Sequence, residues 1–472
     1  MTARWGEVTL EEIVAPLGGE LVMGPGDLII GGLSTDSREI KTGDLFIALK
    51  GEKYDGHAFI KQAVDKGAAC IVIDSDHRPE IPEDQTAGII VVADTLRALG
   101  NLAGWWRHHH TIKIAVITGS AGKTTTKEMC AEILRIGGLT LKNKGNFNNL
   151  IGLPLTLLML EKEHQNAVLE MGMNRPGEIA RLTEIADPDI GLITNVGRAH
   201  LEGLGDIRGV AKAKAEMVER ISSDSQVFLN GDDDLLTEVS RPFQKKVFTF
   251  GLGPRNHIRA QNIRSLGREG STFELQYEGG SIPLRLTVPG LPNVRNALAA
   301  ATIALHMGAP SEDIESGLKG FEGINGRFRM TTLSGGAILV DDTYNSNPYS
   351  LRAAVNALKD LNTEDGRIIV GLGEMMELGQ ETVPAHIEAG EMVAEMGAYY
   401  FMAIGAHAGE MIRGAIEKGF PSERTLLVKT HRAMSRALQD MMQEGDLILL
   451  KGSRRAGLEK VVESLKGINT SG

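Results

Sequence analysis

One strand, turn and helix near residue 120 set the strongest limit on the architecture of this chain. Residues 112–118 form an apolar run, Gly119-Ser-Ala-Gly-Lys-Thr-Thr125 follows at once, and a helix pattern covers residues 124–136. A strand that leads into a helix meets its parallel partner through a crossover connection, whereas an antiparallel partner needs only a short hairpin. The segment therefore predicts an α/β fold with a parallel sheet.

Strand and helix patterns then alternate in three blocks along the 472 residues. At roughly 100 to 200 residues per domain, this length fits three domains. We predict a small mixed N-terminal domain over residues 1–93, a central parallel-sheet domain over residues 94–326 and a Rossmann-like C-terminal domain over residues 327–472. Glycines break short polar strands between residues 258 and 288, which indicates a β-rich insertion in the central domain.

Composition excludes several classes of protein. Acidic residues outnumber basic ones by 61 to 50, and the resulting net charge of -11 opposes nonspecific binding to nucleic acid or to an anionic membrane. The chain has 2 cysteines, Cys70 and Cys130, which lie in apolar stretches without metal-ligand spacing, so we expect a reducing, cytoplasmic environment. We expect no membrane insertion, because no apolar run approaches the ~18 residues that a membrane span needs.

The glycine-rich turn is suited to binding phosphate. Gly119 and Gly122 let backbone amides turn toward phosphate oxygens at a helix start, Lys123 reaches the terminal phosphates, and the Thr124 hydroxyl is a ligand for phosphate-bound Mg²⁺. Ile117 stands where the strict P-loop pattern has glycine, so this is a shorter variant of that loop. We expect a central ATPase domain in which the nucleotide phosphates are bound by Gly119, Ser120, Ala121, Gly122, Lys123, Thr124 and Thr125.

Two later strands end in residues that could bind a metal ion. Glu170 ends one strand pattern, and His200 lies just beyond another. The carboxyl ends of parallel strands meet at one edge of the sheet, which places both side chains near Lys123 and favours a Mg²⁺ site. Taken singly, the two residues also fit a surface carboxylate and a structural histidine. Lys214 lies in an alanine-rich helix, where composition alone favours a solvated face.

These residues occur in segments that resemble the Mur ligases of peptidoglycan synthesis over nearly the whole chain. The segments are residues 34–38, 43–49, 118–126, Asn146-Phe-Asn-Asn149, 170–172, 194–203, 293–296, 325–327, Asp341-Asp-Thr-Tyr-Asn-Ser-Asn-Pro348 and 451–454. The Asn146 and Asp341 segments are similar to those of the members that add D-alanyl-D-alanine to UDP-N-acetylmuramoyl-tripeptide.

The resemblance assigns roles to individual residues. It implies that Ser37 and Arg38 bind the uridine end of the sugar nucleotide. It also implies that Glu170 and His200 bind metal and that Lys214 is carbamylated, which makes a carboxylate long enough to reach the metal. The adenine, ribose and phosphates of ATP are expected to contact Asn293, Asn296, Arg327 and Asp342. Our candidates for contact with D-alanyl-D-alanine are Asn146, Asn149, Tyr344 and Asn345.

The implied activity is ATP-dependent amide ligation through an acyl phosphate, with Lys123 as a catalytic residue, by a chain that we expect to be monomeric. Three alternatives remain open: a sister amide ligase of the folylpolyglutamate or other muramyl-peptide type, an ATP phosphotransferase, and a nucleotide-switched binding protein. The sequence does not fix whether the third residue of the tripeptide is lysine or diaminopimelate.

Overall fold

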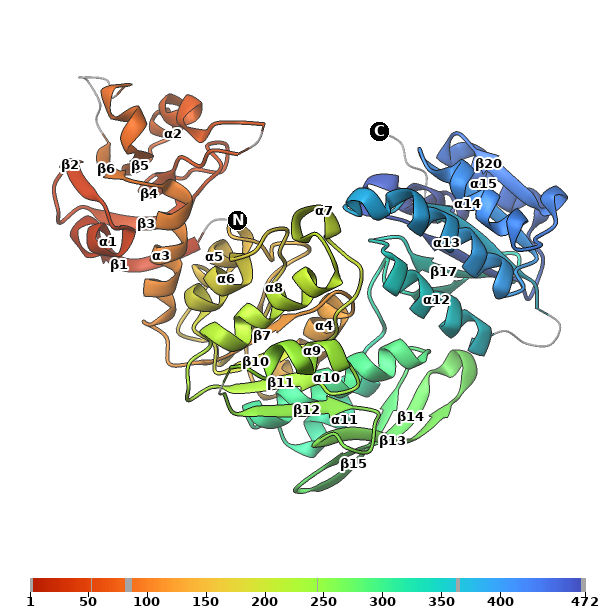
Figure 1. Cartoon of the computed structure of the whole chain (residues 1–472). Helices are drawn as coiled ribbons and strands as arrows, with labels where there is room; N and C mark the ends of the chain where they lie inside the picture. The colour runs from red at the N-terminus through yellow and green to blue at the C-terminus, as the bar shows by residue number, and fades with distance from the viewer. Residues whose placement is uncertain (1–2, 52, 81–86, 244, 362–365, 468–472) are drawn as a thin grey trace.

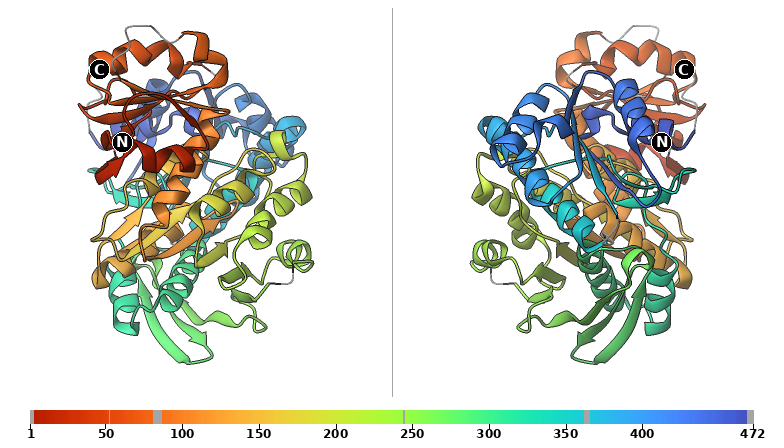
Figure 2. Two further views of the ribbon diagram at one scale, coloured as in Figure 1. Left: turned by 90° about the vertical axis from the view of Figure 1, so that its left-hand side faces the viewer. Right: turned by 90° about the vertical axis from the view of Figure 1, so that its right-hand side faces the viewer.

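The computed structural model describes residues 3–51, 53–80, 87–243, 245–361 and 366–467. These residues form three β-sheets with helices packed against them. Figure 1 shows the N-terminal and C-terminal sheets on the same side of the central sheet and apart from each other, and the side views in Figure 2 show both of them on that same side. The α/β fold class with three parts, predicted from the alternating pattern, is confirmed.

The N-terminal sheet has six strands in the order β1-β3-β4-β5-β6-β2. The strands are β1 (Ala3–Thr9), β2 (Glu20–Met23), β3 (Ile29–Ser34), β4 (Asp44–Ile47), β5 (Cys70–Asp74) and β6 (Gly88–Val92), and the helices of this part are α1 (Leu10–Leu17) and α2 (Ile60–Asp65). Strands β3 to β6 are parallel, whereas β1 and β2 pair antiparallel at the two edges. The sheet is therefore mixed, as expected.

Helix α3 (Thr95–Arg107) joins this sheet to the central part. The Trp106 ring lies 5.4 Å from the Trp5 ring of β1. Trp106 Nε1 donates to Leu160 O at 3.2 Å, and Trp5 Nε1 donates to Leu158 O at 3.3 Å. The indole N–H groups of Trp5 in β1 and Trp106 in α3 thus tie the first sheet and the connecting helix to one segment of the central part, because a buried N–H needs an acceptor.

The central sheet has nine strands in the order β15-β14-β13-β12-β11-β10-β7-β9-β8. They are β7 (Lys113–Thr118), β8 (Thr140–Lys142), β9 (Asn166–Glu170), β10 (Ile190–Ile193), β11 (Gln226–Asn230), β12 (Val247–Gly251), β13 (Ile258–Ser265), β14 (Ser271–Tyr277) and β15 (Gly280–Leu286). Strands β8 to β13 are parallel. The antiparallel pairs β13-β14 and β14-β15 extend one edge and form the predicted β-rich insertion.

Both faces of the parallel strands are covered. Ile114 and Val116 of β7 pack in one apolar cluster, and Ala115 and Ile117 pack in another, because successive side chains of a strand point to opposite faces. The helices of this part are α4 (Lys123–Gly137), α5 (Gly152–Leu157), α6 (Glu178–Ala186), α7 (Leu201–Leu204), α8 (Ile207–Arg220), α9 (Asp234–Ser240), α10 (Leu291–Met307) and α11 (Ser311–Lys319). Because β7, β9 and β10 are parallel, the loops that follow these three strands lie at the same end of the sheet.

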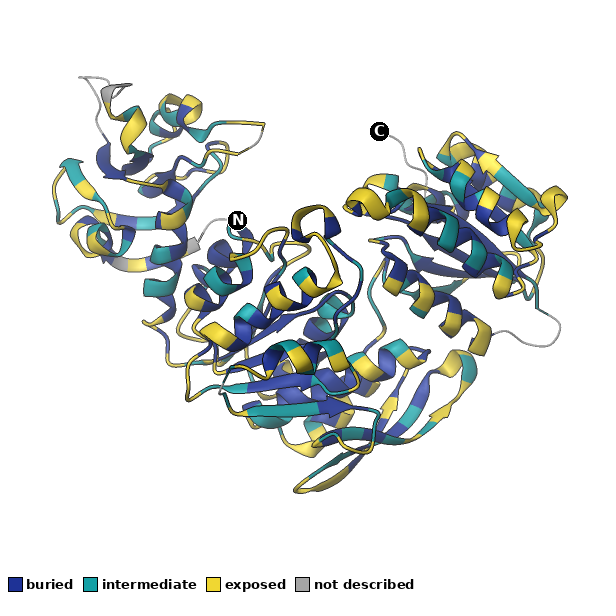
Figure 3. Cartoon of the chain, in the orientation of Figure 1, coloured by how far each residue is buried: buried dark blue, intermediate teal, exposed yellow. Residues whose placement is uncertain are grey.

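The C-terminal sheet has six strands in the order β16-β17-β21-β18-β19-β20, and only the edge pair β16-β17 is antiparallel. The strands are β16 (Arg329–Thr332), β17 (Ile338–Asp342), β18 (Ile368–Gly373), β19 (Tyr400–Ile404), β20 (Thr425–Val428) and β21 (Leu447–Lys451). The helices are α12 (Pro348–Leu361), α13 (Thr382–Glu395), α14 (Ala408–Glu417), α15 (His431–Met441) and α16 (Glu459–Leu465). Figure 3 shows buried residues along these strands and exposed residues on the outer faces of the helices. No helix among the described residues combines the length and apolar character needed to cross a membrane.

Candidate functional site

A cleft of about 740 Å³ lies between the central and C-terminal parts. Its walls come from the loops that follow the parallel strands of both sheets, together with the start of α10. Of the residues singled out in the sequence, the cleft is lined by Ser120, Ala121, Gly122, Lys123, Thr124, Thr125, Asn146, Asn149, Glu170, His200, Asn293, Asn296, Arg327, Asp342, Tyr344 and Asn345. Segments from seven regions of the chain thus meet in one place, as expected where the carboxyl ends of parallel strands converge.

The glycine-rich turn runs from β7 into α4. Gly122 has a left-handed backbone with φ of 83°, and a Cβ at this position would lie 2.3 Å from Asn296 Oδ1. A Cβ at Gly119 would lie 1.9 Å from Thr194 Oγ1, although Gly119 itself does not line the cleft. Only glycine fits these two close approaches, so the turn keeps the start of α4 open to an anion.

Lys123 is the first residue of α4. Its Nζ donates to Gly119 O at 2.7 Å, which folds the side chain back over the turn. Burial lowers the pKa of Lys123, and the Arg327 charge acts in the same direction, while Glu170 and Glu377 oppose the shift. A cation that is desolvated in this way gains most when a phosphate anion enters beside it.

Glu170 is held at the end of β9 by neutral partners. Thr124 Oγ1 donates to Glu170 Oε2 at 2.7 Å, and Asn148 Nδ2 donates to Oε1 at 2.8 Å. Asn143 exchanges two further hydrogen bonds with the Glu170 backbone. The carboxylate is 3% exposed, and it stands beside a hydroxyl oxygen, which is a donor set that suits Mg²⁺.

His200 follows β10 and adopts a left-handed backbone with φ of 57°. Its Nδ1 lies 2.6 Å from Oε2 of Glu377, which belongs to the loop after β18 in the C-terminal part. His200 and Lys123 lower the pKa of the Glu377 carboxyl, so the carboxylate is ionised in this contact. The sequence did not single out Glu377, because its partner is more than 170 positions away along the chain.

Lys214 lies on α8 and is 2% exposed. The prediction of a solvated lysine, which the composition of this helix alone favours, is therefore wrong. Burial lowers the pKa of its amine well below the usual lysine value, and the Lys123 charge adds to this effect. Lys214 does not line the cleft, but it lies close enough to Lys123 for the two charges to interact. The neighbouring Lys212 on the same helix is exposed. A buried amine without its proton is a nucleophile, which is the form that reacts with carbon dioxide.

The C-terminal part contributes cations to the cleft. Arg327 Nη2 donates to Thr124 Oγ1 at 3.0 Å, and the Arg327 guanidinium stacks 3.9 Å above the Tyr344 ring. Lys451 Nζ donates to Asp342 Oδ2 at 2.7 Å. Sequence reasoning assigned no role to Lys451, although it ends β21 in the position that Asp342 holds on β17.

The asparagine candidates differ in what their side chains do. Asn293 Nδ2 donates to Pro289 O at 2.8 Å at the start of α10. Asn149 Oδ1 accepts the backbone N–H groups of Ile151 and Gly152, so this oxygen supports the start of α5. Asn148, which the sequence did not select, is the member of its segment that contacts Glu170.

Ser37 and Arg38 lie away from the cleft, in the loop after β3. Ser37 Oγ donates to Gln62 Oε1 at 2.6 Å. The Arg38 guanidinium pairs with Asp36 at 2.6 Å and lowers the pKa of that carboxyl to about 2. These two residues therefore belong to a separate surface on the N-terminal part.

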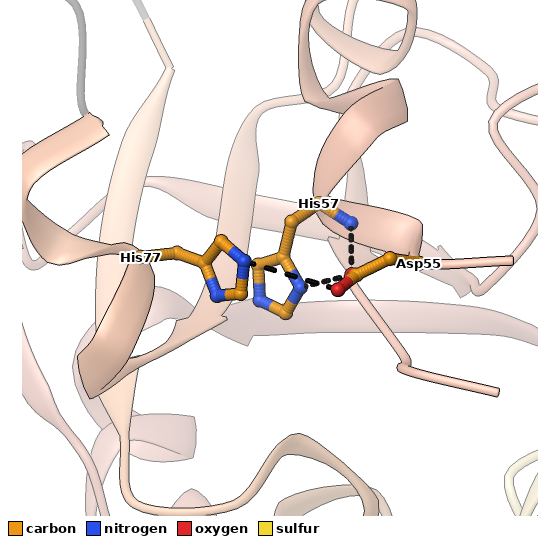
Figure 4. Close-up of side chains that lie close together, drawn as sticks. All are labelled: Asp55, His57 and His77. Carbon is orange, nitrogen blue, oxygen red and sulfur yellow. Dashed lines mark hydrogen bonds and ion pairs between the residues drawn. The ribbon is translucent and has the colours of Figure 1, made fainter.

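A second cluster of titratable side chains lies in the same part, where ligand atoms of Asp55, His57 and His77 come within 4.8 Å of one another (Figure 4). The Asp74 N–H donates to His57 Nε2 at 3.2 Å, so this ring carries its proton on Nδ1, which lies 2.6 Å from Asp55 Oδ1. The imidazole rings of His57 and His77 stack with their centroids 3.7 Å apart and their planes within 6° of parallel. An ion in the plane of one ring would lie outside the plane of the other, so the cluster acts as a hydrogen-bonded support for this turn.

The fold and the cleft define a nucleotide-binding α/β protein in which a central phosphate loop faces a second parallel sheet. Family models match three stretches of the chain: Mur ligase family, catalytic domain at residues 29–106, Mur ligase middle domain at residues 117–304, and Mur ligase, glutamate ligase domain at residues 326–454. The chain belongs to the Mur ligase family, as the resemblance of its sequence segments predicted.

Individual relatives align with this chain over nearly their whole length. The UDP-N-acetylmuramoyl-tripeptide--D-alanyl-D-alanine ligase of Escherichia coli (strain K12) is 36% identical over 97% of this chain and 98% of its own length. A MurF crystal structure from Acinetobacter baumannii superposes with a TM-score of 0.86 at 32% identity, covering 98% of this chain and 99% of that one. The crystal structure of MurF ligase from Thermotoga maritima in complex with ADP superposes with a TM-score of 0.82 at 26% identity, covering 92% of this chain and 97% of that one.

Proposed function

We propose that this chain is an ATP-dependent ligase that joins D-alanyl-D-alanine to UDP-N-acetylmuramoyl-tripeptide through an acyl phosphate, with ADP and phosphate as the other products. The meeting of Lys123, Glu170 and Arg327 in one cleft carries the proposal, because phosphoryl transfer needs positioned charges more than covalent catalysis. The similarity to ligases of that name over nearly the full length supports the choice of substrates.

The first step activates the acid. The terminal carboxylate of the tripeptide attacks the γ-phosphorus of ATP in line, and the bond from that phosphorus to the bridging oxygen of ADP breaks. Negative charge spreads over the transferring oxygens, and Lys123 and Arg327 are placed to neutralise it. Asn293, Asn296 and Asp342 line the same cleft as these cations, and we assign them to the adenosine end of ATP.

The donor set around Glu170 fits Mg²⁺. Thr124, Glu170 and His200 are the residues that would hold the ion, together with the carbamate formed when the neutral Lys214 amine adds to carbon dioxide. Bound there, Mg²⁺ would supply positive charge to the phosphate oxygens.

The second step forms the amide bond. The free amine of D-alanyl-D-alanine attacks the carbonyl carbon of the acyl phosphate, and the tetrahedral intermediate expels phosphate as the amine loses its proton. Asn146, Asn149, Tyr344 and Asn345 line the same cleft, and we propose that they surround the dipeptide. The C-terminal part closes the cleft and keeps water from the acyl phosphate, whose hydrolysis would waste ATP.

The N-terminal part holds the other end of the long substrate. We assign the uridine diphosphate to the surface around Ser37 and Arg38. We propose that residues 1–93 bind the sugar nucleotide, that residues 94–326 bind ATP, and that residues 327–472 form the ligase domain. The buried free thiols of Cys70 and Cys130 support a reducing, cytoplasmic setting. We also propose that the chain acts as a monomer, because the residues named for both steps of the reaction lie in one cleft of this chain.

One measurement tests the proposal. Phosphate release is followed with ATP alone, with each substrate singly and with both, using substrate labelled with heavy oxygen in its terminal carboxylate. We expect release only with both substrates and transfer of the label to phosphate. A sister ligase would respond to a different amine or acid, a phosphotransferase would release no phosphate, and a nucleotide-switched protein would release it without either substrate.

A further inference from the structure

Two residues with an uncommon backbone conformation face each other across the cleft. His200 and Glu377 both have a positive φ, of 57° and 63°, which side chains with a Cβ seldom adopt. Their side chains meet, with His200 Nδ1 2.6 Å from Glu377 Oε2. Backbone strain of this kind persists only where the surroundings hold it, and it gathers at functional positions.

The contact joins two parts of the molecule. His200 follows β10 of the central sheet, and Glu377 follows β18 of the C-terminal sheet. The N–H of Glu202 donates to Glu377 O at 3.2 Å, so the backbone of the loop is fixed as well as its carboxylate. Arg198 reaches Glu381 at 3.9 Å and also pairs with Glu388, which adds ion pairs beside the contact.

The chemistry of imidazole gives this contact a consequence. A neutral histidine carries its proton on one ring nitrogen and a lone pair on the other, and a carboxylate beside one nitrogen decides which nitrogen keeps the proton. Glu377 lies 2.6 Å from Nδ1, so a proton on that nitrogen would face the carboxylate and would leave the lone pair on Nε2. Histidines that bind metal or move protons are commonly oriented by a partner of this kind.

We propose that Glu377 is a positioning residue for His200: its carboxylate, 2.6 Å from Nδ1, favours a proton on that nitrogen and so keeps the Nε2 lone pair available to the reaction. Because Glu377 comes from the C-terminal part, His200 is set in this state only when the two parts meet. The kinetic consequence rests on the proposed function, whereas the protonation state of the ring does not.

The direct test reads the ring without any turnover. The protein is labelled with ¹⁵N in its histidines, of which the chain has 12, and the His200 signals are identified by their loss in His200→Ala. We expect long-range ¹H-¹⁵N spectra of the ligand-free protein to show a protonated Nδ1 and an unprotonated Nε2. In Glu377→Ala we expect a mixture of the two neutral tautomers. A protonated Nε2 in the unaltered protein, or an unchanged pattern in Glu377→Ala, would overturn the proposal.

Kinetics supply the second reading. Glu377→Gln is expected to lower kcat by roughly 10 to 100-fold, the usual cost of losing such a partner, with the KM for D-alanyl-D-alanine changed less than about twofold. Glu381→Gln is the matched control, because Glu381 contacts Arg198 across the same boundary, does not contact His200, and should leave kcat unchanged. In the His200→Ala background, Glu377→Gln should have no further effect. Equal losses in both backgrounds would contradict the proposal, whereas an inactive unaltered protein would contradict only the proposed function.

Discussion

Thr124 Oγ1 donates a hydrogen bond of 2.7 Å to Glu170 Oε2, and this bond links the first turn of α4 to the end of β9. The other carboxylate oxygen accepts from Asn148 at 2.8 Å. The two potential metal ligands are therefore already adjacent, and each is oriented by its own strand or helix. An arrangement fixed in this way lowers the cost of ordering ligands when a cation binds.

The first prediction concerns Glu170→Gln. The substitution keeps the shape of the side chain but removes its charge, so the Mg²⁺ concentration needed for half-maximal phosphate release should rise at least ~10-fold. Titration of Mg²⁺ at fixed ATP measures this shift. Glu132→Gln, on the same helix as Thr124 and paired with Arg135, serves as the control. An unchanged Mg²⁺ dependence would exclude Glu170 as a ligand.

The second prediction concerns the cation of the phosphate loop. Lys123→Ala should lower the rate of phosphate release at least ~100-fold, because the charge that spreads over the transferring oxygens loses its nearest cation. Binding of the UDP substrate, measured by calorimetry, should be preserved, since the proposed uridine surface is separate. Lys319→Ala, at an exposed helix end, controls for general loss of positive charge. Normal turnover would refute the role of Lys123.

The parallel sheet and the phosphate loop could be predicted because their signals are local in the sequence. The burial of Lys214 could not be predicted from the local pattern, since an alanine-rich helix carries no sign of which of its faces will be covered, and only the family resemblance pointed to this residue. Asn148 and Asn149 show the same limit at the scale of one residue. The backbone of their turn decides that one contacts Glu170 and the other supports α5, and that backbone is not written in the residue types. Glu377 depends on two distant parts of the chain meeting.

The third prediction concerns Arg38. Loss of one charge-assisted contact to a diphosphate costs about 1.5 to 3 kcal/mol, so Arg38→Ala should raise the KM for UDP-N-acetylmuramoyl-tripeptide at least ~10-fold. The KM for ATP should stay unchanged. Because Arg38 lowers the pKa of the Asp36 carboxyl to about 2, this carboxylate gains a proton only as the pH falls toward that value. Substrate affinity should therefore show no contribution from Asp36 between pH 5 and 8, roughly three units or more above that pKa.

The fourth prediction concerns carbon dioxide. If the Lys214 carbamate takes part in the reaction, degassed, bicarbonate-free protein should lose activity and regain it when bicarbonate is added. Lys214→Ala should lower turnover at least ~100-fold and abolish the bicarbonate effect. Labelled bicarbonate should give a carbamate signal in ¹³C spectra of the unaltered protein. Lys212→Ala, two positions earlier on α8 and exposed, should behave normally. Full activity of Lys214→Ala would remove the carbamate from the mechanism.

The same lysine should also cost stability when it is not carbamylated. A buried amine loses its hydration, so Lys214→Met should raise the free energy of unfolding at pH 7 by about 1 to 3 kcal/mol in bicarbonate-free buffer. The sign of the pH effect follows from the lowered pKa of Lys214. Below the unfolded pKa of about 10.5, the unfolded chain binds a proton that the folded chain resists, so this group destabilises the fold more as the pH falls toward its folded pKa.

Urea unfolding of both proteins at pH 7 and at pH 10 checks this account. The advantage of Lys214→Met should shrink as the pH rises, because near pH 10.5 the unfolded amine is losing its proton as well. All other titrating groups are shared by the two proteins, so the difference between them isolates Lys214. Lys212→Met, whose wild-type amine is solvated in both states, should show no such difference. A Lys214→Met advantage that is absent, or that is equal at both pH values, would show that the buried amine is not held neutral, and the nucleophile that the carbamate requires would then be missing.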